Sequence, residues 1–101
     1  MKRLKDKKVI RSIFETGKTI SGGIIIAKYL DVDSGNLFTV SSKKFKRAVD
    51  RNRIKRLMRE SVRKYDLSKS YAFIYVCDEI KSQKEVDLSI NKILNDIQNY
   101  K

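Results

Sequence analysis

Hydrophobic residues near the N-terminus recur at helical spacing. The apolar positions of this segment are Val9, Ile10, Ile13 and Phe14. They lie three and four residues apart, so they form one stripe of an amphipathic helix. Asp6 is suited to cap the start of this helix, and Gly17 is suited to the left-handed residue that often closes one. The pattern predicts a short helix between these two residues.

The next apolar segments have strand character. After Gly22 and Gly23, residues 24–31 form a run rich in strand-forming side chains. Residues 33–36 have the composition of a turn, and residues 37–42 favour a second strand. Because the two runs are joined by so short a turn, the pattern predicts a β-hairpin.

The middle of the chain combines an apolar stripe with a run of cations. We expect a helix that begins between Arg47 and Asp50 and continues to about Lys64, with Asp50 able to cap it. Residues placed at 100° intervals form an apolar face of Ile54, Leu57, Met58, Ser61 and Val62. We expect Ile54 and Leu57 to anchor this helix to the sheet. Another face gathers Asn52, Lys55, Arg56, Arg59 and Arg63.

The last third of the chain predicts one more strand and one more helix. Residues 71–77 form a compact apolar run that is typical of a buried strand. Ser82 and Glu85 have the spacing of a capping box, and the apolar stripe of the helix after it is Val86, Ile90, Ile93, Leu94 and Ile97. The order of elements predicts an α+β or α/β fold, with helices packed on a small sheet.

Length and composition limit the classes of protein that fit. A chain of 101 residues suits one domain, spanning residues 1–101. Its single cysteine excludes an internal disulfide, and no apolar run approaches the ~20 residues that span a bilayer. We therefore expect a soluble, cytoplasmic protein with no membrane partner and no structural metal site.

Positive charge points to a polyanionic partner. Lys and Arg outnumber Asp and Glu by 24 to 12, giving a formal net charge of +12. Residues 43–64 contain eleven of the basic residues, against only Asp50 and Glu60. A solvated helix face normally mixes charges of both signs, so this concentration favours nucleic-acid binding. A ribosomal or DNA-binding module remains an alternative, because Asn52 and the arginines could also contact base edges.

Catalytic side chains are poorly represented. The chain contains no histidine, and its acids are scattered without a visible pair. General acid and base chemistry carried by the protein itself is therefore poorly supported, although a Lys or Tyr could still move a proton. We expect no catalytic residue on this chain.

The middle of the basic helix has a distinctive sequence. It consists of Arg51, Asn52, Arg53, Ile54, Lys55 and Arg56, with residues 46–49 before it and Arg59 after it. This pattern resembles the signature helix of the bacterial ribonuclease P protein component. The likeness extends to Gly17 and the strand after it, to residues 42–44 and to the strand at 71–77, and it weakens beyond Cys77.

The resemblance implies a particular fold. It predicts an α+β protein with three helices on a small, mainly antiparallel sheet, in the order α-β-β-β-α-β-α. This arrangement is similar to the second domain of ribosomal protein S5. The resemblance also implies a left-handed β-α-β crossover, although such crossovers are right-handed in about 98% of cases.

The resemblance also implies a function. Members of the family bind a large catalytic RNA and the 5′ leader of precursor tRNA, while the RNA carries out a Mg²⁺-dependent hydrolysis. The chain is then part of an endoribonuclease without being its catalyst, and no obligate protein partner is expected.

Two surfaces follow from the matched positions. The RNA-binding residues would be Lys44, Arg47, Arg51, Asn52, Arg53, Lys55, Arg56 and Arg59. Arg53 lies away from the main cationic arc, so it could instead pair with an acid or cover apolar surface. A cleft for the leader would be lined by Ile10, Phe14 and Lys28. Ile10 and Phe14 could also be ordinary core residues of an amphipathic helix.

Overall fold

A computed structural model of the protein describes residues 3–67 and 69–99. Within this part of the chain there are three helices and four strands. In order, they are α1 (Lys7–Thr16), β1 (Lys18–Ser21), β2 (Ile25–Leu30), β3 (Asn36–Val40), α2 (Ala48–Val62), β4 (Ser70–Tyr75) and α3 (Gln83–Asn99). The predicted α+β class and the order α-β-β-β-α-β-α are confirmed.

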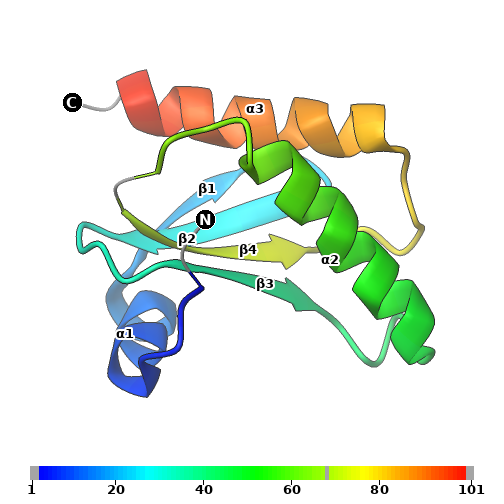
Figure 1. Cartoon of the computed structure of the whole chain (residues 1–101), viewed down its shortest axis with the longest axis horizontal. Coiled ribbons are helices and arrows are strands. Elements are labelled where there is room, and N and C mark those ends of the chain that lie inside the picture. The colour runs from blue at the N-terminus through cyan, green and yellow to red at the C-terminus, as the bar shows by residue number, and fades with distance from the viewer. Residues whose placement is uncertain (1–2, 68, 100–101) are drawn as a thin grey trace.

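The strands form one mixed sheet in the order β1-β2-β4-β3. The pairs β1–β2 and β2–β4 are antiparallel, and β3–β4 is parallel, so the sheet is mainly antiparallel as expected. In Figure 1, β3 and β4 both point to the right with β4 above β3, and α2 crosses on the viewer's side. This is the left-handed sense of crossover.

The predicted hairpin between residues 24–31 and 37–42 is wrong. β2 and β3 are not neighbours, because β4 lies between them and pairs with both. The reason is burial: every residue of β4 except Ile74 is buried, so this strand needs cover on both faces and takes a central position. The hairpin that does form joins β1 to β2, and its turn contains Gly23 with a φ of 98°, which favours glycine.

The helices cover both faces of the sheet (Figure 1). α2 and α3 pack on one face, where the main core gathers side chains from β2, β4 and both helices. α1 packs on the other face, where Ile13 contacts Leu4 and Ala72. Because β2 alternates between buried and half-buried residues, its successive side chains point to the two faces in turn.

α1 starts and ends where predicted, but Gly17 closes it in a different backbone conformation. The Asp6 carboxylate accepts a hydrogen bond from the Lys8 amide at 2.9 Å, which confirms the N-cap. Gly17 has an extended backbone (φ −67°, ψ 151°) and is not left-handed. Glycine is required there by close packing, because a Cβ on Gly17 would lie 2.3 Å from the Ile13 carbonyl oxygen.

α2 corrects two expectations. Its N-cap is Arg47, which makes no side-chain capping bond, and Asp50 lies inside the first turn. There its negative charge is favourable to the helix dipole without capping the end. Ile54 is fully buried as expected, but Leu57 is only half-buried against the core. Met58, which is fully buried, anchors the helix together with Ile54.

α3 begins with the predicted capping box. The Ser82 amide donates to the Glu85 carboxylate, and the Glu85 amide donates to the Ser82 hydroxyl, both at 3.3 Å. Val86, Ile90, Ile93 and Leu94 are buried as expected. The side chain of Ile97 lies outside the described part of the structure.

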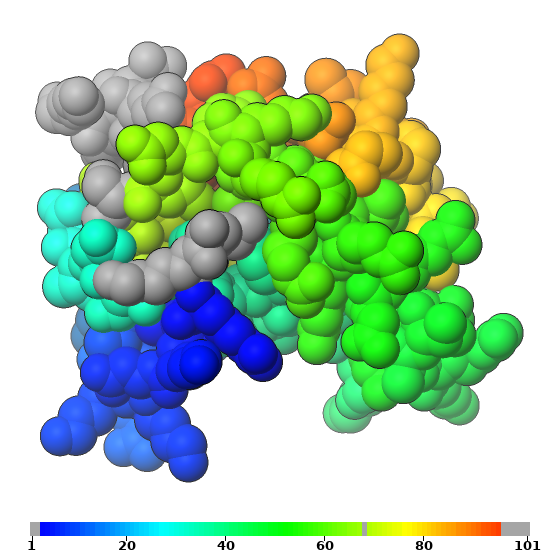
Figure 2. Space-filling model, in the orientation of Figure 1, coloured from blue at the N-terminus to red at the C-terminus, as the bar shows by residue number. Residues whose placement is uncertain are grey.

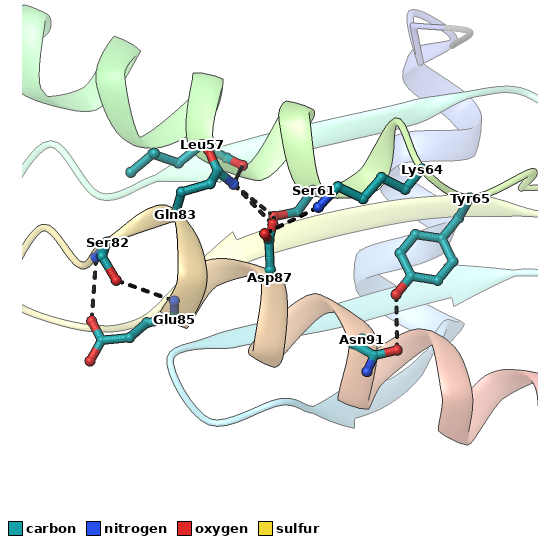
Figure 3. A network of polar contacts seen from close by, with 9 residues as sticks. All are labelled: Leu57, Ser61, Lys64, Tyr65, Ser82, Gln83, Glu85, Asp87 and Asn91. Carbon is teal, nitrogen blue, oxygen red and sulfur yellow. Dashed lines mark hydrogen bonds and ion pairs between the residues drawn. The ribbon is translucent and has the colours of Figure 1, made fainter.

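A polar cluster joins α2 to α3 (Figure 3). The buried Ser61 hydroxyl donates to Asp87, and Gln83 Nε2 donates to the Leu57 carbonyl, Ser61 Oγ and Asp87 Oδ1, each at 3.0 Å. Lys64 Nζ lies 3.2 Å from Asp87 Oδ2. These partners, the Ser61 hydroxyl first among them, lower the pKa of Asp87. The contact between the helices therefore depends on a charged carboxylate.

The Asp87 charge should make stability depend on pH. A carboxyl whose pKa is lowered by folding stabilises the fold above its unfolded-state pKa, and this contribution is lost as the pH falls through the lowered folded-state value. The Asp87→Asn variant should lose ~1 kcal/mol at neutral pH, which is a few degrees in Tm. The difference from the parent protein should shrink between about pH 5 and pH 3.

Thermal melts across this pH range measure the effect. Asp78→Asn is a matched control, because Asp78 is paired with Lys44 at the surface and its side chain is 82% exposed. A Tm difference for Asp87→Asn that stays constant with pH would contradict the assignment.

Candidate nucleic-acid interface

α2 has one face toward the core and one toward solvent. Ile54, Met58 and Val62 are buried against the sheet. The other side of the helix contains most of the predicted RNA-binding residues, which are Asn52, Arg53, Arg56 and Arg59, all exposed, and Lys55, which is half-buried. The anchoring stripe therefore fixes the direction in which these polar side chains point.

The cations of this face lack acidic partners. No ion pair joins Arg53, Lys55, Arg56 or Arg59 to an acid among the residues that the structure describes. Arg53 therefore forms no pair of the kind that the sequence allowed. Arg63, at the end of the helix, lies 3.3 Å from Glu60. Uncompensated positive charge along a rigid helix produces a positive potential suited to a phosphate backbone.

Arg51 differs from its neighbours because its guanidinium is already engaged. Its Nη1 donates to the carbonyl oxygens of Phe45 at 2.8 Å and Lys46 at 2.9 Å. Phe45 is itself buried in the core. Arg51 therefore fixes the segment that leads into α2, and with it the position of Arg47, which is exposed at the start of the helix.

Lys44 is also tied to the protein. Its Nζ donates to the Val76 carbonyl at 2.8 Å and lies 3.1 Å from Asp78. These contacts join the lead-in segment to the chain that follows β4. Part of the charge of Lys44 is offset by Asp78.

A hollow separates the C-terminal half of α2 from the outer edge of β3. We name it the α2–β3 cleft, and it has a volume of about 550 Å³. It is lined by Arg3, Asn36, Leu37, Phe38, Lys55, Arg59 and Arg63. In Figure 2 the blue N-terminal segment and the green α2 form its walls, with teal β3 between them.

Most residues of the α2–β3 cleft were not predicted as site residues. Lys55 and Arg59 belong to the predicted set, and Arg63 lies on the cationic face that the helical spacing defines. Arg3, Asn36 and Phe38 carried no comparable signal, because the position of β3 beside α2 follows from the crossover and not from local sequence. Arg59 stands over the Phe38 ring, with 5.8 Å between its guanidinium carbon and the ring centroid.

The residues of the predicted leader cleft lie on the opposite face of the sheet. Ile10 and Phe14 belong to α1, and Lys28 shares its sheet face with Ala72, which α1 contacts. Ile10 packs on the small core under α1, so it has the structural role that the sequence also allowed. Phe14 is 42% exposed and is not a core residue. Lys28 Nζ lies 3.3 Å from Thr19 Oγ1.

Two half-buried residues beside Lys28 were not predicted as site residues. Ile26 and Ile74 are direct partners in the β2–β4 register and lie on the face that α1 only partly covers. The signal was the two-residue alternation of residues 24–31, which places Ile26 on the same face as Lys28. The structure thus separates the predicted residues into two surfaces, one on α2 and one beside α1.

Two tyrosines and one lysine have pKa values shifted away from neutral pH. Burial raises the pKa of Tyr71 to about 12. Burial also raises the pKa of Tyr75, whose hydroxyl donates to the Glu79 carbonyl at 2.7 Å. The Glu79 carboxylate raises the pKa of Lys81. All of these shifts lead away from neutral pH, where a general acid or base should titrate.

Two further properties concern metals and membranes. Within residues 3–67 and 69–99, no three His, Cys, Asp or Glu side chains form a group that could hold a metal ion. None of the described helices combines the length and apolarity needed to cross a membrane.

Comparisons with known proteins agree with this fold. A family model described as Ribonuclease P matches residues 1–98. The ribonuclease P protein component of Syntrophomonas wolfei is 38% identical over 65 residues, covering 62% of this chain and 55% of the relative. The protein of the same name from Chlorobaculum tepidum is 38% identical over 78 residues, covering 66% and 51%. The chain spans about half the length of these curated relatives.

Solved structures show the same fold at low sequence identity. The RNase P protein of Staphylococcus aureus superimposes with a TM-score of 0.81 at 20% identity, covering 100% of this chain and 99% of that one. The RNase P protein of Thermotoga maritima gives 0.71 at 21% identity, with 98% and 97% covered. Because the family model matches nearly the whole sequence, residues 1–98, the chain belongs to the ribonuclease P protein family.

Proposed function

We propose that this chain is the protein subunit of a ribonuclease P ribonucleoprotein, which removes the 5′ leader from precursor tRNA. The observation that carries the proposal is the solvent face of α2, where Arg53, Lys55, Arg56 and Arg59 have no acidic partner among the described residues. The family assignment supports the same function.

The catalytic RNA would bind along α2. Arg53, Arg56 and Arg59 present guanidinium groups, whose planar donors match phosphate oxygens. Arg47 adds charge at the helix N-terminus, where the helix dipole is also positive. Arg51 and Lys44 would act as positioning residues, because their hydrogen bonds hold the lead-in segment against the core.

The chemistry would belong to the RNA. A large RNA can hold the Mg²⁺ ions that activate a water and stabilise the leaving oxygen. The protein would lower the repulsion between two polyanions and orient the precursor, so the holoenzyme is the endonuclease. No cofactor is proposed on the protein itself.

The precursor would be recognised on the α1 side of the sheet. Phe14 is exposed, Lys28 supplies a cation, and Ile26 and Ile74 give a partly apolar floor. An unpaired strand can pack its bases on such a surface while a lysine contacts its backbone. The leader is single-stranded and is absent from mature tRNA, so this face would distinguish the two.

Salt dependence tests the α2 interface. Each neutralised phosphate releases counterions, so six or so contacts imply a log-log slope of roughly −4 to −6 for affinity against salt. Arg56→Ala should reduce the magnitude of this slope by about one unit, with the fold unchanged, since Arg56 is exposed.

Binding titrations with the catalytic RNA at several salt concentrations measure the slope. Lys92→Ala is the matched control, because it removes one exposed charge from α3 and should change the slope little. The α2 assignment fails if both variants change the slope equally. Tighter binding to duplex DNA than to the catalytic RNA would favour a DNA-binding module instead.

A second prediction concerns the leader. Base packing on an aromatic ring is worth ~1 to 3 kcal/mol, so Phe14→Ala should weaken precursor tRNA binding by the assembled holoenzyme about 5-fold to 150-fold. Affinity for mature tRNA should stay nearly unchanged. Circular dichroism should show an intact fold, because Phe14 lies outside the core.

Leu88→Ala serves as the control for Phe14→Ala. Leu88 is an exposed apolar residue of α3, on the other side of the sheet from α1, and its loss should affect neither tRNA. Equal weakening of precursor and mature tRNA by Phe14→Ala would show that this face does not read the leader.

A further inference from the structure

Asn36, which lines the α2–β3 cleft, has a buried side-chain oxygen without a hydrogen-bond partner among the described residues. The Asn36 residue is 6% exposed, and its Oδ1 accepts no hydrogen bond from any described residue. Its backbone carbonyl is used, since it accepts from the Leu4 amide at 2.9 Å. A buried carbonyl oxygen without a hydrogen-bond donor costs free energy, and a ligand that donates to it would recover that cost.

The same cleft contains a rigid aromatic ring. Phe38 stacks on Phe73 of the central strand, with ring centroids 5.5 Å apart and planes 15° from parallel. Arg59 lies over the Phe38 ring at 5.8 Å. An aromatic ring paired with a guanidinium plane is a surface on which a nucleobase can stack.

Cations surround this surface. Arg3 lies on the N-terminal side of the cleft, and Lys55 and Arg63 lie one helical turn before and after Arg59 on α2. No acid is among the residues that line the cleft. Its volume of about 550 Å³ falls within the range of about 300–1,000 Å³ that small-molecule sites occupy. A flat ring, an amide and phosphate-binding cations are therefore combined in one hollow of suitable size.

We propose that the α2–β3 cleft binds a single unstacked nucleotide of an RNA chain. The base packs against the Phe38–Arg59 pair, and the Asn36 amide hydrogen-bonds to its edge. Lys55, Arg63 and Arg3 contact the flanking phosphates. The proposal rests on the proposed RNA binding by α2 and adds to it a site that reads a base.

The arrangement of the cleft favours a nucleotide within a chain over a free one. Lys55, Arg59 and Arg63 of α2 line the cleft, so it continues the cationic face of this helix and a phosphate backbone bound along α2 can reach it. Asn36 also lines a second hollow of about 300 Å³, which contains Asp33 and Asp66 beside Lys69 and is therefore less suited to phosphates than the α2–β3 cleft. The site lies on the opposite sheet face from Phe14 and Lys28, so it is separate from the proposed leader surface.

NMR titration of the whole ¹⁵N-labelled protein tests the site directly. The probes are adenosine monophosphate, ribose 5-phosphate and hexaadenylate RNA. We expect adenosine monophosphate and hexaadenylate to shift the side-chain amide signal of Asn36 and the backbone signal of Phe38. Hexaadenylate should bind at least 10-fold more tightly, because its backbone adds phosphate contacts.

Other outcomes of the titration overturn the proposal. An equal response to ribose 5-phosphate would define a phosphate site that does not contact bases. Equal affinity for adenosine monophosphate and hexaadenylate would define a site for free nucleotides. The absence of any shift at Asn36 and Phe38 with all three probes would exclude a nucleotide in the cleft.

Variants separate this site from the general RNA interface. Asn36→Ala and Phe38→Leu remove no charge, so each should weaken binding to the catalytic RNA about 5-fold or more without changing the salt slope. Arg56 does not line the cleft, so Arg56→Ala should flatten the slope whether or not the cleft binds a base. The ¹⁵N spectrum of each variant shows whether it is folded. If one of the two cleft variants does not fold, the other still tests the site.

The two possible failures are distinguishable. If Arg56→Ala flattens the slope while both folded cleft variants bind as tightly as the parent protein, only the nucleotide site is wrong. If Arg56→Ala has no effect on RNA binding, the proposed function of α2 fails, and the inference about the cleft fails with it.

Discussion

The burial of β4 on both faces determines how the rest of the molecule is arranged. Its residues from Ser70 to Phe73, and Tyr75, are buried, so the strand must lie inside the sheet with helices on either side. It pairs antiparallel with β2 and parallel with β3, which requires α2 to cross over between β3 and β4. As a result α2 and α1 lie on opposite faces, and the chain has two separate polar surfaces.

The cationic face of α2 is held in place by contacts that are partly polar. Ile54 and Met58 anchor the helix in the core, while Ser61 hydrogen-bonds to Asp87 of α3 (Figure 3). The Arg51 guanidinium donates hydrogen bonds to backbone carbonyls of the segment before the helix. Like charges along one helix repel each other, so the anchoring contacts offset a cost that a bound polyanion would relieve. Stability and the proposed RNA binding would therefore be linked through this helix.

Local sequence patterns predicted the helices and strands better than they predicted which strands lie side by side. Asp6, Ser82 and Glu85 cap helices where their spacing indicated, because capping involves residues only two or three positions apart. The hairpin was wrong because pairing depends on which strand needs most burial, and β4 comes later in the chain. The cationic helix was predictable because its faces follow from local spacing. Asn36 and Phe38 were not predictable as site residues, because β3 lies beside α2 only as a result of the crossover.

The central claim is that this protein supports a reaction carried out by its RNA partner. Cleavage of precursor tRNA at low Mg²⁺ tests it most directly, measured with the catalytic RNA alone, the protein alone and the two combined. The account predicts efficient 5′ cleavage only when both are present, and none by the protein alone at any Mg²⁺ concentration. Site-specific cleavage by the purified protein without RNA would contradict the account.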